Sequence, residues 1–303
     1  MNKILIGDAI EKLRELPDES VQCCVTSPPY LGLRDYENDG QLGLEKTPEE
    51  FVENLVAVFR EVKRVLKKDG TLWLNIGDSY ASNQSAGDRV SKYSPKQTTN
   101  AGKTGGKQTV PKGLKPKDLV GVPWRVAFAL QADGWYLRQE IIWSKPNPMP
   151  ESVTDRCTKS HESIFLLTKS PRYFFDHEAI KEKTLTRDNS DRDRDNTRLN
   201  NTPGRTRMAG LKTNDYEKRN KRSVWEIATQ PFSGAHFAVF PQKLPELCIK
   251  AGSRLNDTIL DPFFGSGTTG LVAKKAGRKY IGIELNPEYA ELAEERLSQE
   301  TLF

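Results

Sequence analysis

The chain has few cysteines and histidines, and it lacks long apolar runs. Its four cysteines form no Cys-x-x-Cys pair and its three histidines do not cluster, so we expect no metal site. No apolar run approaches the ~18 residues that a membrane-spanning helix needs. The N-terminus turns acidic at Asp8, too early for a secretory signal. We therefore expect a cytoplasmic protein with no membrane partner.

Positive charge is concentrated in two polar stretches, although the net charge of the 303 residues is only +5. Residues 81–118 contain eight Lys/Arg against two Asp/Glu, and residues 181–222 contain thirteen against seven. The rest of the chain is therefore net acidic. The two stretches are either solvated linkers or loops that bind the phosphates of a nucleic acid.

Seven apolar runs of strand length recur along the chain. They cover residues 3–7, 21–26, 71–76, 137–143, 163–168, 258–261 and 279–284. Helical patterns separate several of them, at residues 47–68, 123–132 and 268–276. Strands that alternate with helices indicate parallel βαβ units, and apolar strands without alternation fit a sheet covered on both faces. We predict an α/β fold with a doubly wound, mostly parallel sheet.

A glycine-rich loop follows the sixth predicted strand and precedes a helix. Residues 261–270 read DPFFGSGTTG and match G-x-G-x-x-G through Gly265, Gly267 and Gly270. Glu284 ends the next strand, 19 residues after Gly265. This is the layout of a nucleotide-binding turn, in which glycines let the backbone approach a ligand and an acid accepts hydrogen bonds from ribose.

Two ligands compete for this loop, a dinucleotide and S-adenosylmethionine (SAM). A dinucleotide places its pyrophosphate at the helix N-terminus, where the Asp261 carboxylate would repel it. The same carboxylate would attract the ammonium or the sulfonium group of SAM. Only about 20 residues follow Glu284, so the remaining strands must come from the N-terminal side. We favour SAM and a circularly permuted order, with a nicotinamide-dependent oxidoreductase as the alternative.

A double-proline motif, Ser27-Pro28-Pro29-Tyr30, ends the second predicted strand. The prolines fix φ and remove two N–H donors, so the chain leaves the strand extended and its carbonyl oxygens stay free to accept hydrogen bonds. The carboxyl ends of strands are where α/β sheets place their sites. A tyrosine ring beside such acceptors can stack on a flat base. The alternative is a strand stop followed by a core tyrosine.

The double-proline motif resembles the catalytic motif of amino methyltransferases that act on cytosine N4 or adenine N6. The loop 261–270 resembles their SAM-binding motif. The order, with the catalytic motif first, resembles the permuted β-class of these DNA enzymes. The resemblance covers nearly the whole chain apart from residues 81–118 and 181–222. It implies a Rossmann-like SAM methyltransferase fold, circularly permuted, with an inserted target-recognition region.

The resemblance also implies a division of the chain. A catalytic half would span residues 1–180, including the basic loop 81–118. A target-recognition region would span residues 181–225, and a SAM-binding half residues 226–303. The implied partner is double-stranded DNA, and the implied source is bacterial, archaeal or phage-encoded. A homodimer and a cognate restriction endonuclease are left open.

Single residues carry over from the resemblance as expected ligands. For SAM they are Asp8, Asp261, Pro262, Phe263, Gly265, Gly267, Thr268, Glu284, His236 and Phe240. For DNA they are Trp143, Lys145, Arg198, Arg205 and Arg207. Trp143 could instead belong to the core, and His236 could be a structural histidine.

The chemistry assigns roles to the catalytic motif. An exocyclic amino nitrogen is a poor nucleophile because its lone pair is delocalised into the ring. Ser27 Oγ and the Pro28 carbonyl are candidate acceptors for its protons, and Tyr30 would hold the base by stacking. No metal or cysteine nucleophile is needed, and the chain has no Pro-Cys motif of the C5-cytosine class. The family tendency links Ser-Pro-Pro-Tyr with cytosine N4, so we favour it over adenine N6.

The target base lies paired inside duplex DNA and must be flipped out, at a cost of a few kcal/mol. Phosphate contacts from the two basic stretches could offset that cost. A non-catalytic DNA-binding module and methylation of RNA or of a protein glutamine are further alternatives. The intact motifs argue against the first, and the basic stretches favour a nucleic acid over a protein.

Overall fold

The computed structural model describes residues 2–32, 40–81, 110–111, 113–183, 218–230 and 240–299. The chain divides into two compact units, which are residues 1–176 with 223–303, and residues 177–222. The second unit contains a short 3-10 helix and the strand pair β6 (Glu182–Lys183) and β7 (Lys218–Arg219). No helix within the described ranges is long and apolar enough to cross a membrane.

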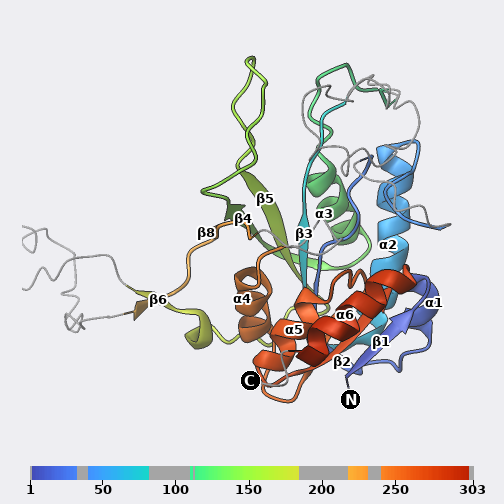
Figure 1. Ribbon diagram of the computed structural model, residues 1–303, viewed down its shortest axis with the longest axis vertical. Coiled ribbons are helices and arrows are strands. Elements are labelled where there is room, and N and C mark those ends of the chain that lie inside the picture. The colour runs from blue at the N-terminus through green and yellow to red at the C-terminus, as the bar shows by residue number, and fades with distance from the viewer. Residues whose placement is uncertain are drawn as a thin grey trace, which may run out of the picture. The chain divides into compact units, whose positions relative to one another are not determined.

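An eight-stranded sheet forms the centre of the first unit (Figure 1). Its order is β1-β10-β9-β2-β3-β5-β4-β8, and all neighbours run parallel except β5, which is antiparallel to β3 and β4. The strands are β1 (Lys3–Ile6), β2 (Val21–Thr26), β3 (Leu66–Ile76), β4 (Tyr136–Ser144), β5 (His161–Thr168), β8 (Val224–Glu226), β9 (Thr258–Asp261) and β10 (Lys279–Glu284). The predicted α/β fold with a mostly parallel sheet is confirmed.

Two details of the sheet differ from the prediction. The helix expected over residues 47–68 ends at Val65, and the expected stop at residues 67–70 lies within β3. Leu66 is fully buried and pairs with Val21, and a bulge precedes the regular pairing of Cys23 with Thr71. Strand β8, which pairs with β4, was not predicted. Three residues are too few for a periodic signal.

Helices cover the sheet in two groups (Figure 1). The first group packs together and consists of α1 (Ala9–Arg14), α2 (Pro48–Val65) and α3 (Val122–Ala132). The second consists of α4 (Lys243–Gly252), α5 (Thr268–Lys275) and α6 (Pro287–Gln299). This arrangement leaves the carboxyl ends of the parallel strands as the open edge of the sheet.

Helix α2 illustrates how the sequence makes this scaffold. Thr47 caps its N-terminus by accepting a hydrogen bond from the Glu50 amide, and Pro48 occupies the first turn. Phe51, Leu55, Phe59, Val62 and Val65 recur at helical spacing and are fully buried. Burial of each such side chain contributes about 1.5–3 kcal/mol, so α2 anchors the sheet firmly.

The sheet order brings the two ends of the chain together. β1, near the N-terminus, pairs with β10, near the C-terminus, and β2 pairs with β9. The segments that follow β2, β9 and β10 must therefore lie at the same edge. Both predicted motifs are in these segments.

Candidate functional site

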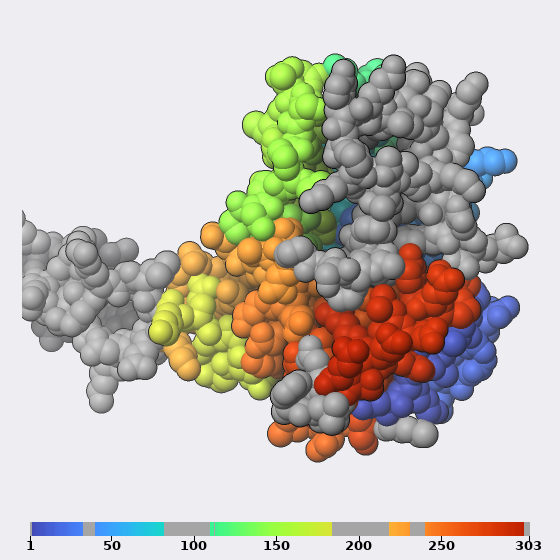
Figure 2. All heavy atoms as spheres, in the orientation of Figure 1, coloured from blue at the N-terminus to red at the C-terminus, as the bar shows by residue number. Residues whose placement is uncertain are grey.

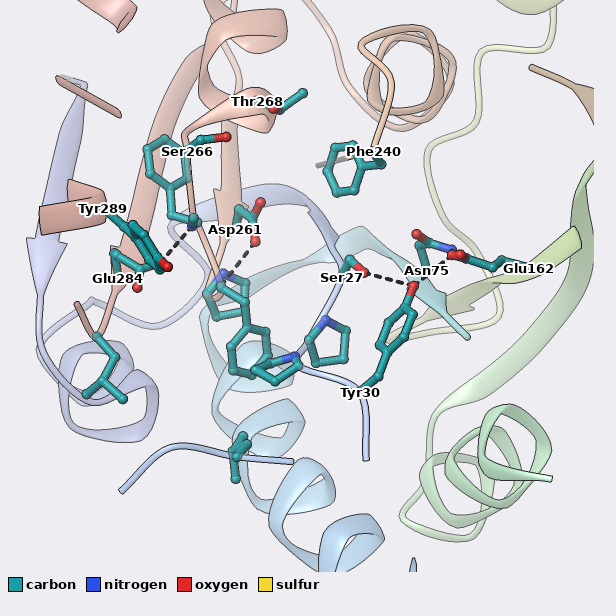
Figure 3. A pocket seen from close by; sticks show the side chains of 18 of the residues that line it. Ser27, Tyr30, Asn75, Glu162, Phe240, Asp261, Ser266, Thr268, Glu284 and Tyr289 are labelled. Carbon is teal, nitrogen blue, oxygen red and sulfur yellow. Dashed lines mark hydrogen bonds between the residues drawn. The ribbon is translucent and has the colours of Figure 1, made fainter. Parts of the chain in front are cut away.

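A cavity of about 720 Å³ opens along this edge of the sheet (Figure 3). Its walls include residues 27–30 after β2, 261–266 at the end of β9 and 283–286 at the end of β10. Its volume lies within the ~300–1,000 Å³ that small-molecule sites occupy. The double-proline motif and the glycine loop, more than 230 positions apart in the sequence, thus share one cavity.

Asp261 ends β9 and is 2% exposed. Its carboxylate accepts hydrogen bonds from Thr26 Oγ1 at 2.6 Å, from Thr269 Oγ1 at 2.7 Å and from the Phe263 amide at 3.1 Å. Burial raises the pKa of Asp261 to about 7, against the opposing effect of these bonds. The carboxyl group therefore joins β9 to β2 and α5, and its charge will respond to a nearby cation.

The three glycines of the loop have different surroundings. Gly265 and Gly267 have φ of 52° and 77°, a left-handed conformation that favours glycine. Only Gly265 lines the cavity. A Cβ on Gly267 would lie 3.0 Å from Ala293 Cβ, and one on Gly270 would lie 2.5 Å from Phe264 Cζ. Packing thus requires a residue without a side chain at Gly267 and Gly270, and a contact of Gly267 with SAM stays a prediction.

Glu284 ends β10 and lines the cavity beside Tyr289 (Figure 3). Its carboxylate accepts the Gly265 amide at 2.7 Å and the Asn286 amide at 2.9 Å. Burial raises the pKa of Glu284 above its usual range. A carboxylate has about four lone pairs, so Glu284 can still accept hydrogen bonds from hydroxyl groups of a ligand.

Five of the other predicted cofactor residues line the same cavity. Asp8 lines it and caps α1 by accepting the Glu11 amide at 3.0 Å. Pro262, Phe263, Thr268 and Phe240 also line the cavity. His236 lies outside the described residues.

A hydrogen-bond network holds Tyr30 on the opposite side (Figure 3). Ser27 Oγ donates to Tyr30 Oη at 3.4 Å, and Tyr30 Oη donates to Glu162 Oε2 at 2.7 Å. The same Oε2 accepts from Asn75 Nδ2 at 3.0 Å, and Lys145 Nζ forms an ion pair with Oε1. Glu162, on β5, thus joins β3 and the residue that follows β4 to the catalytic motif.

The ring of Tyr30 is also held by a contact with Gly77. A Cβ on Gly77 would lie 2.5 Å from Tyr30 Cε2, so the ring rests on the backbone that follows β3. Burial, with the neighbouring charge of Glu162, raises the pKa of Tyr30 well above its usual value. The hydroxyl therefore stays protonated and remains a donor to Glu162.

Trp143 and Lys145 form the wall at the end of β4. Trp143 is 4% exposed and its Nε1 donates to the Ile227 carbonyl at 2.8 Å. Lys145 Nζ lies 4.4 Å from the centroid of the Trp143 ring. Both residues line the cavity, so Trp143 is a core residue and a wall residue at once.

Comparison with known proteins identifies the family. The family model described as DNA methylase matches residues 21–295. The chain is 51% identical over 296 residues to the type II methyltransferase M.SmaI of Serratia marcescens, covering 97% of this chain and 90% of that protein. It is 49% identical over 294 residues to M.Cfr9I of Citrobacter freundii, covering 97% and 87%. The chain belongs to the DNA methylase family.

Solved structures agree on the fold of this methylase. The cytosine-N4-specific PvuII DNA methyltransferase is 21% identical, with a TM-score of 0.64 over 99% of this chain and 91% of that chain. A putative DNA modification methylase from Thermus thermophilus, complexed with SAM, is 25% identical, with a TM-score of 0.63 over 100% and 95%. The Rossmann-like methyltransferase fold is confirmed.

Several cavity residues of this methylase were not predicted from sequence. They are Asn75, Lys159, Glu162 and Tyr289. The available signals were weak: Asn75 interrupts an apolar strand, and Glu162 precedes one. Burial lowers the pKa of Lys159, next to Asp78 and Glu162, which act in the opposite direction. The predicted DNA ligands Arg198, Arg205 and Arg207 lie outside the described residues.

Proposed function

We propose that this methylase transfers a methyl group from SAM to N4 of a cytosine flipped out of duplex DNA. The observation that carries the proposal is the shared cavity, which joins the acceptor groups of Ser27 and Pro28 to the buried Asp261 and the half-buried Glu284. A methyl donor and a base need to meet in one water-poor space for transfer.

The residues on the β9–β10 side fit SAM. When bound, SAM supplies an electrophilic methyl group on a positively charged sulfur. Glu284 has acceptor capacity for the ribose hydroxyls, and Asp8 for the adenine amino group. Asp261 supplies negative charge, which a positively charged ligand favours. Phe240 offers an apolar surface to the methionine end, and the SAM-bound Thermus thermophilus relative supports this cofactor.

Residues on the β2 side would prepare the base. Ser27 Oγ and the Pro28 carbonyl would accept hydrogen bonds from the amino group and so favour a tetrahedral nitrogen. Tyr30 would stack on the base, with its ring already oriented by Glu162 and Gly77. The amino proton becomes acidic as the N–C bond forms, so no strong base is needed beforehand. Positioning and preorganised polar groups would supply most of the rate acceleration.

The DNA side of the proposal involves residues 181–225 as the target-recognition region. Its excess of Arg and Lys supports phosphate and base-edge contacts by Arg198, Arg205 and Arg207. Replacing Arg205 and Arg207 by alanine should weaken DNA binding and flatten its salt dependence. An unchanged salt slope would remove these two residues from the interface. A homodimer and a cognate endonuclease stay predictions of the sequence.

The test of the function is to identify the methylated nucleoside. DNA incubated with the protein and SAM is digested to nucleosides, which are separated and weighed by mass spectrometry. N4-methylcytosine is expected, with Tyr30→Ala as the inactive control. Detection of N6-methyladenine instead would show that the target base is adenine and not cytosine. If no methylated nucleoside appears although SAM binds, the proposed activity is wrong.

A further inference from the structure

The loop between β4 and β5 carries an apolar side chain in an unusual position. It projects from the sheet (Figure 1), and its atoms, light green in Figure 2, lie at the surface. Met149 on this loop is 84% exposed, more than any other large apolar residue in the described part of the chain. Met149 also lines the cavity. It therefore stands at the rim, with most of its surface in water.

The backbone around Met149 is restrained. Pro148 and Pro150 flank it, which fixes φ on both sides and limits Met149 itself to extended conformations. Asn147 accepts the Thr229 amide at 2.9 Å and donates through Nδ2 to the Thr229 carbonyl at 3.3 Å. The Lys145 amide donates to the Ser160 carbonyl at 2.8 Å, and this hydrogen bond joins the two ends of the loop. The side chain is thus presented to solvent by a stiff support.

The exposed side chain of Met149 does not gain the stabilisation that burial of an apolar group gives. Burying a methionine side chain contributes about 1.5–3 kcal/mol, which Met149 does not gain in the free protein. Val153, on the same loop, is 41% exposed and does not line the cavity. Met149 is therefore distinguished by its place at the cavity rim as well as by its exposure.

Base flipping creates a need that such a side chain can meet. A base that leaves the duplex opens a gap in the stack, and closing of this gap drives the base back. DNA-binding proteins insert apolar side chains, methionine among them, between neighbouring bases of the stack. The base pairs adjacent to a target base in the cavity must pass close to its rim.

We infer that Met149 enters the DNA stack and occupies the gap that the flipped target base leaves. The inference rests on the proposed function, since it requires a flipped base in the cavity. Burial of Met149 between neighbouring bases would stabilise the flipped state. The stiff flanking prolines would reduce the entropy lost when the side chain is inserted.

The test compares Met149→Ala with Val153→Ala on two DNA substrates. Both are synthetic, unmethylated duplexes that contain the recognition site of the protein. This site is mapped beforehand with the wild-type protein. One is fully paired, and the other has an abasic site opposite the target, which removes the pairing that resists flipping. On the paired duplex, Met149→Ala should lower kcat/KM about 10-fold or more, as loss of one buried apolar side chain predicts. On the abasic duplex it should stay within about twofold of wild type.

Controls separate this role from a general defect. Val153→Ala should match wild type on both substrates, and Met149→Leu should retain most activity because it keeps the apolar volume. The affinity for SAM should not change in any of these variants. Wild-type activity of Met149→Ala on the paired duplex, or an equal loss on both duplexes, would overturn the inference. Failure of the wild-type protein to methylate DNA would instead reject the proposed function.

Discussion

The two sides of the cavity are built in different ways. On the β9–β10 side, Asp261 and Glu284 accept hydrogen bonds from residues of the segment 263–286, and Asp261 accepts one more from Thr26 on β2. On the β2 side, Tyr30 is held by Glu162, 132 positions later in the chain. Most donors on the cofactor side thus come from the C-terminal segment that contains both acids, whereas Tyr30 is held by a residue that only the order of the strands brings to it. The two sides should therefore respond separately to mutation.

The largest effect is expected on the base side. Tyr30→Ala removes the stacking surface and should lower the methylation rate by about 100-fold or more, the loss that misplacement of a reacting group can cause. The affinity for SAM should stay within about twofold of wild type, because Tyr30 is not part of the β9–β10 side. Transfer from radiolabelled SAM and calorimetric titration measure the two quantities. Full activity would reject the stacking role, and lost SAM binding would contradict the separation of the two sides.

The next effect concerns the cofactor side. Glu284→Ala removes a charged acceptor and should weaken SAM binding about 10- to 100-fold, since hydrogen bonds to charged groups contribute about 1.5–3 kcal/mol. The rate at saturating SAM should change much less. Glu288→Ala, four residues later and outside the cavity wall, is the matched control. Unchanged affinity in Glu284→Ala would remove this residue from the site.

A smaller effect concerns stability and pH. The folded-state pKa of Asp261 is about 7, against an ordinary value of 3.8. Between these values the folded protein retains a proton that the unfolded chain has lost, so the wild type loses stability as pH rises from about 4 to 7. Asp261→Asn has no such group, so its stability relative to wild type should increase over this interval and level off above it. Urea unfolding at several pH values measures the trend, and a pH-independent difference would contradict it.

The smallest effect tests the link between strands. Glu162→Gln keeps an oxygen that can accept from the Tyr30 hydroxyl but loses the charge that pairs with Lys145. We expect a several-fold lower kcat with unchanged SAM affinity. Tyr30→Phe lacks the hydroxyl. In the double mutant with Glu162→Ala it should lower kcat little further than Glu162→Ala does alone. Full additivity of these two mutations would show that Tyr30 and Glu162 act independently.

The same contrast explains how far the sequence could predict the site. The glycine loop and the double-proline motif were predicted because each is a run of neighbouring residues with its own chemistry. Asn75 and Glu162 were not, because they come together only after β3 and β5 have paired in the sheet. No local pattern relates either residue to Tyr30.

Predictions of the fold show a similar limit. Seven of the eight strands of the large sheet were predicted from apolar runs, and the circular permutation was predicted from the position of the glycine loop late in the chain. The start of β3 at Leu66 was missed because a bulge places polar Lys67, Lys68 and Asp69 within a strand. Gly270 matches the third glycine of the motif, and in the structure it accommodates the Phe264 ring, a contact that the motif does not predict. The motif specifies where the glycines stand but not which side chains pack against them, so this contact could not be predicted from the motif.

The most direct test of the account is a crystal structure of the protein with a nonreactive SAM analogue and an unmethylated duplex that contains the recognition site. We predict the analogue beside Glu284, the target base against Tyr30, and the methyl-bearing position about 3–3.5 Å from the amino nitrogen, the separation that in-line transfer needs. A complex in which the analogue and the target base occupy separate cavities would contradict it.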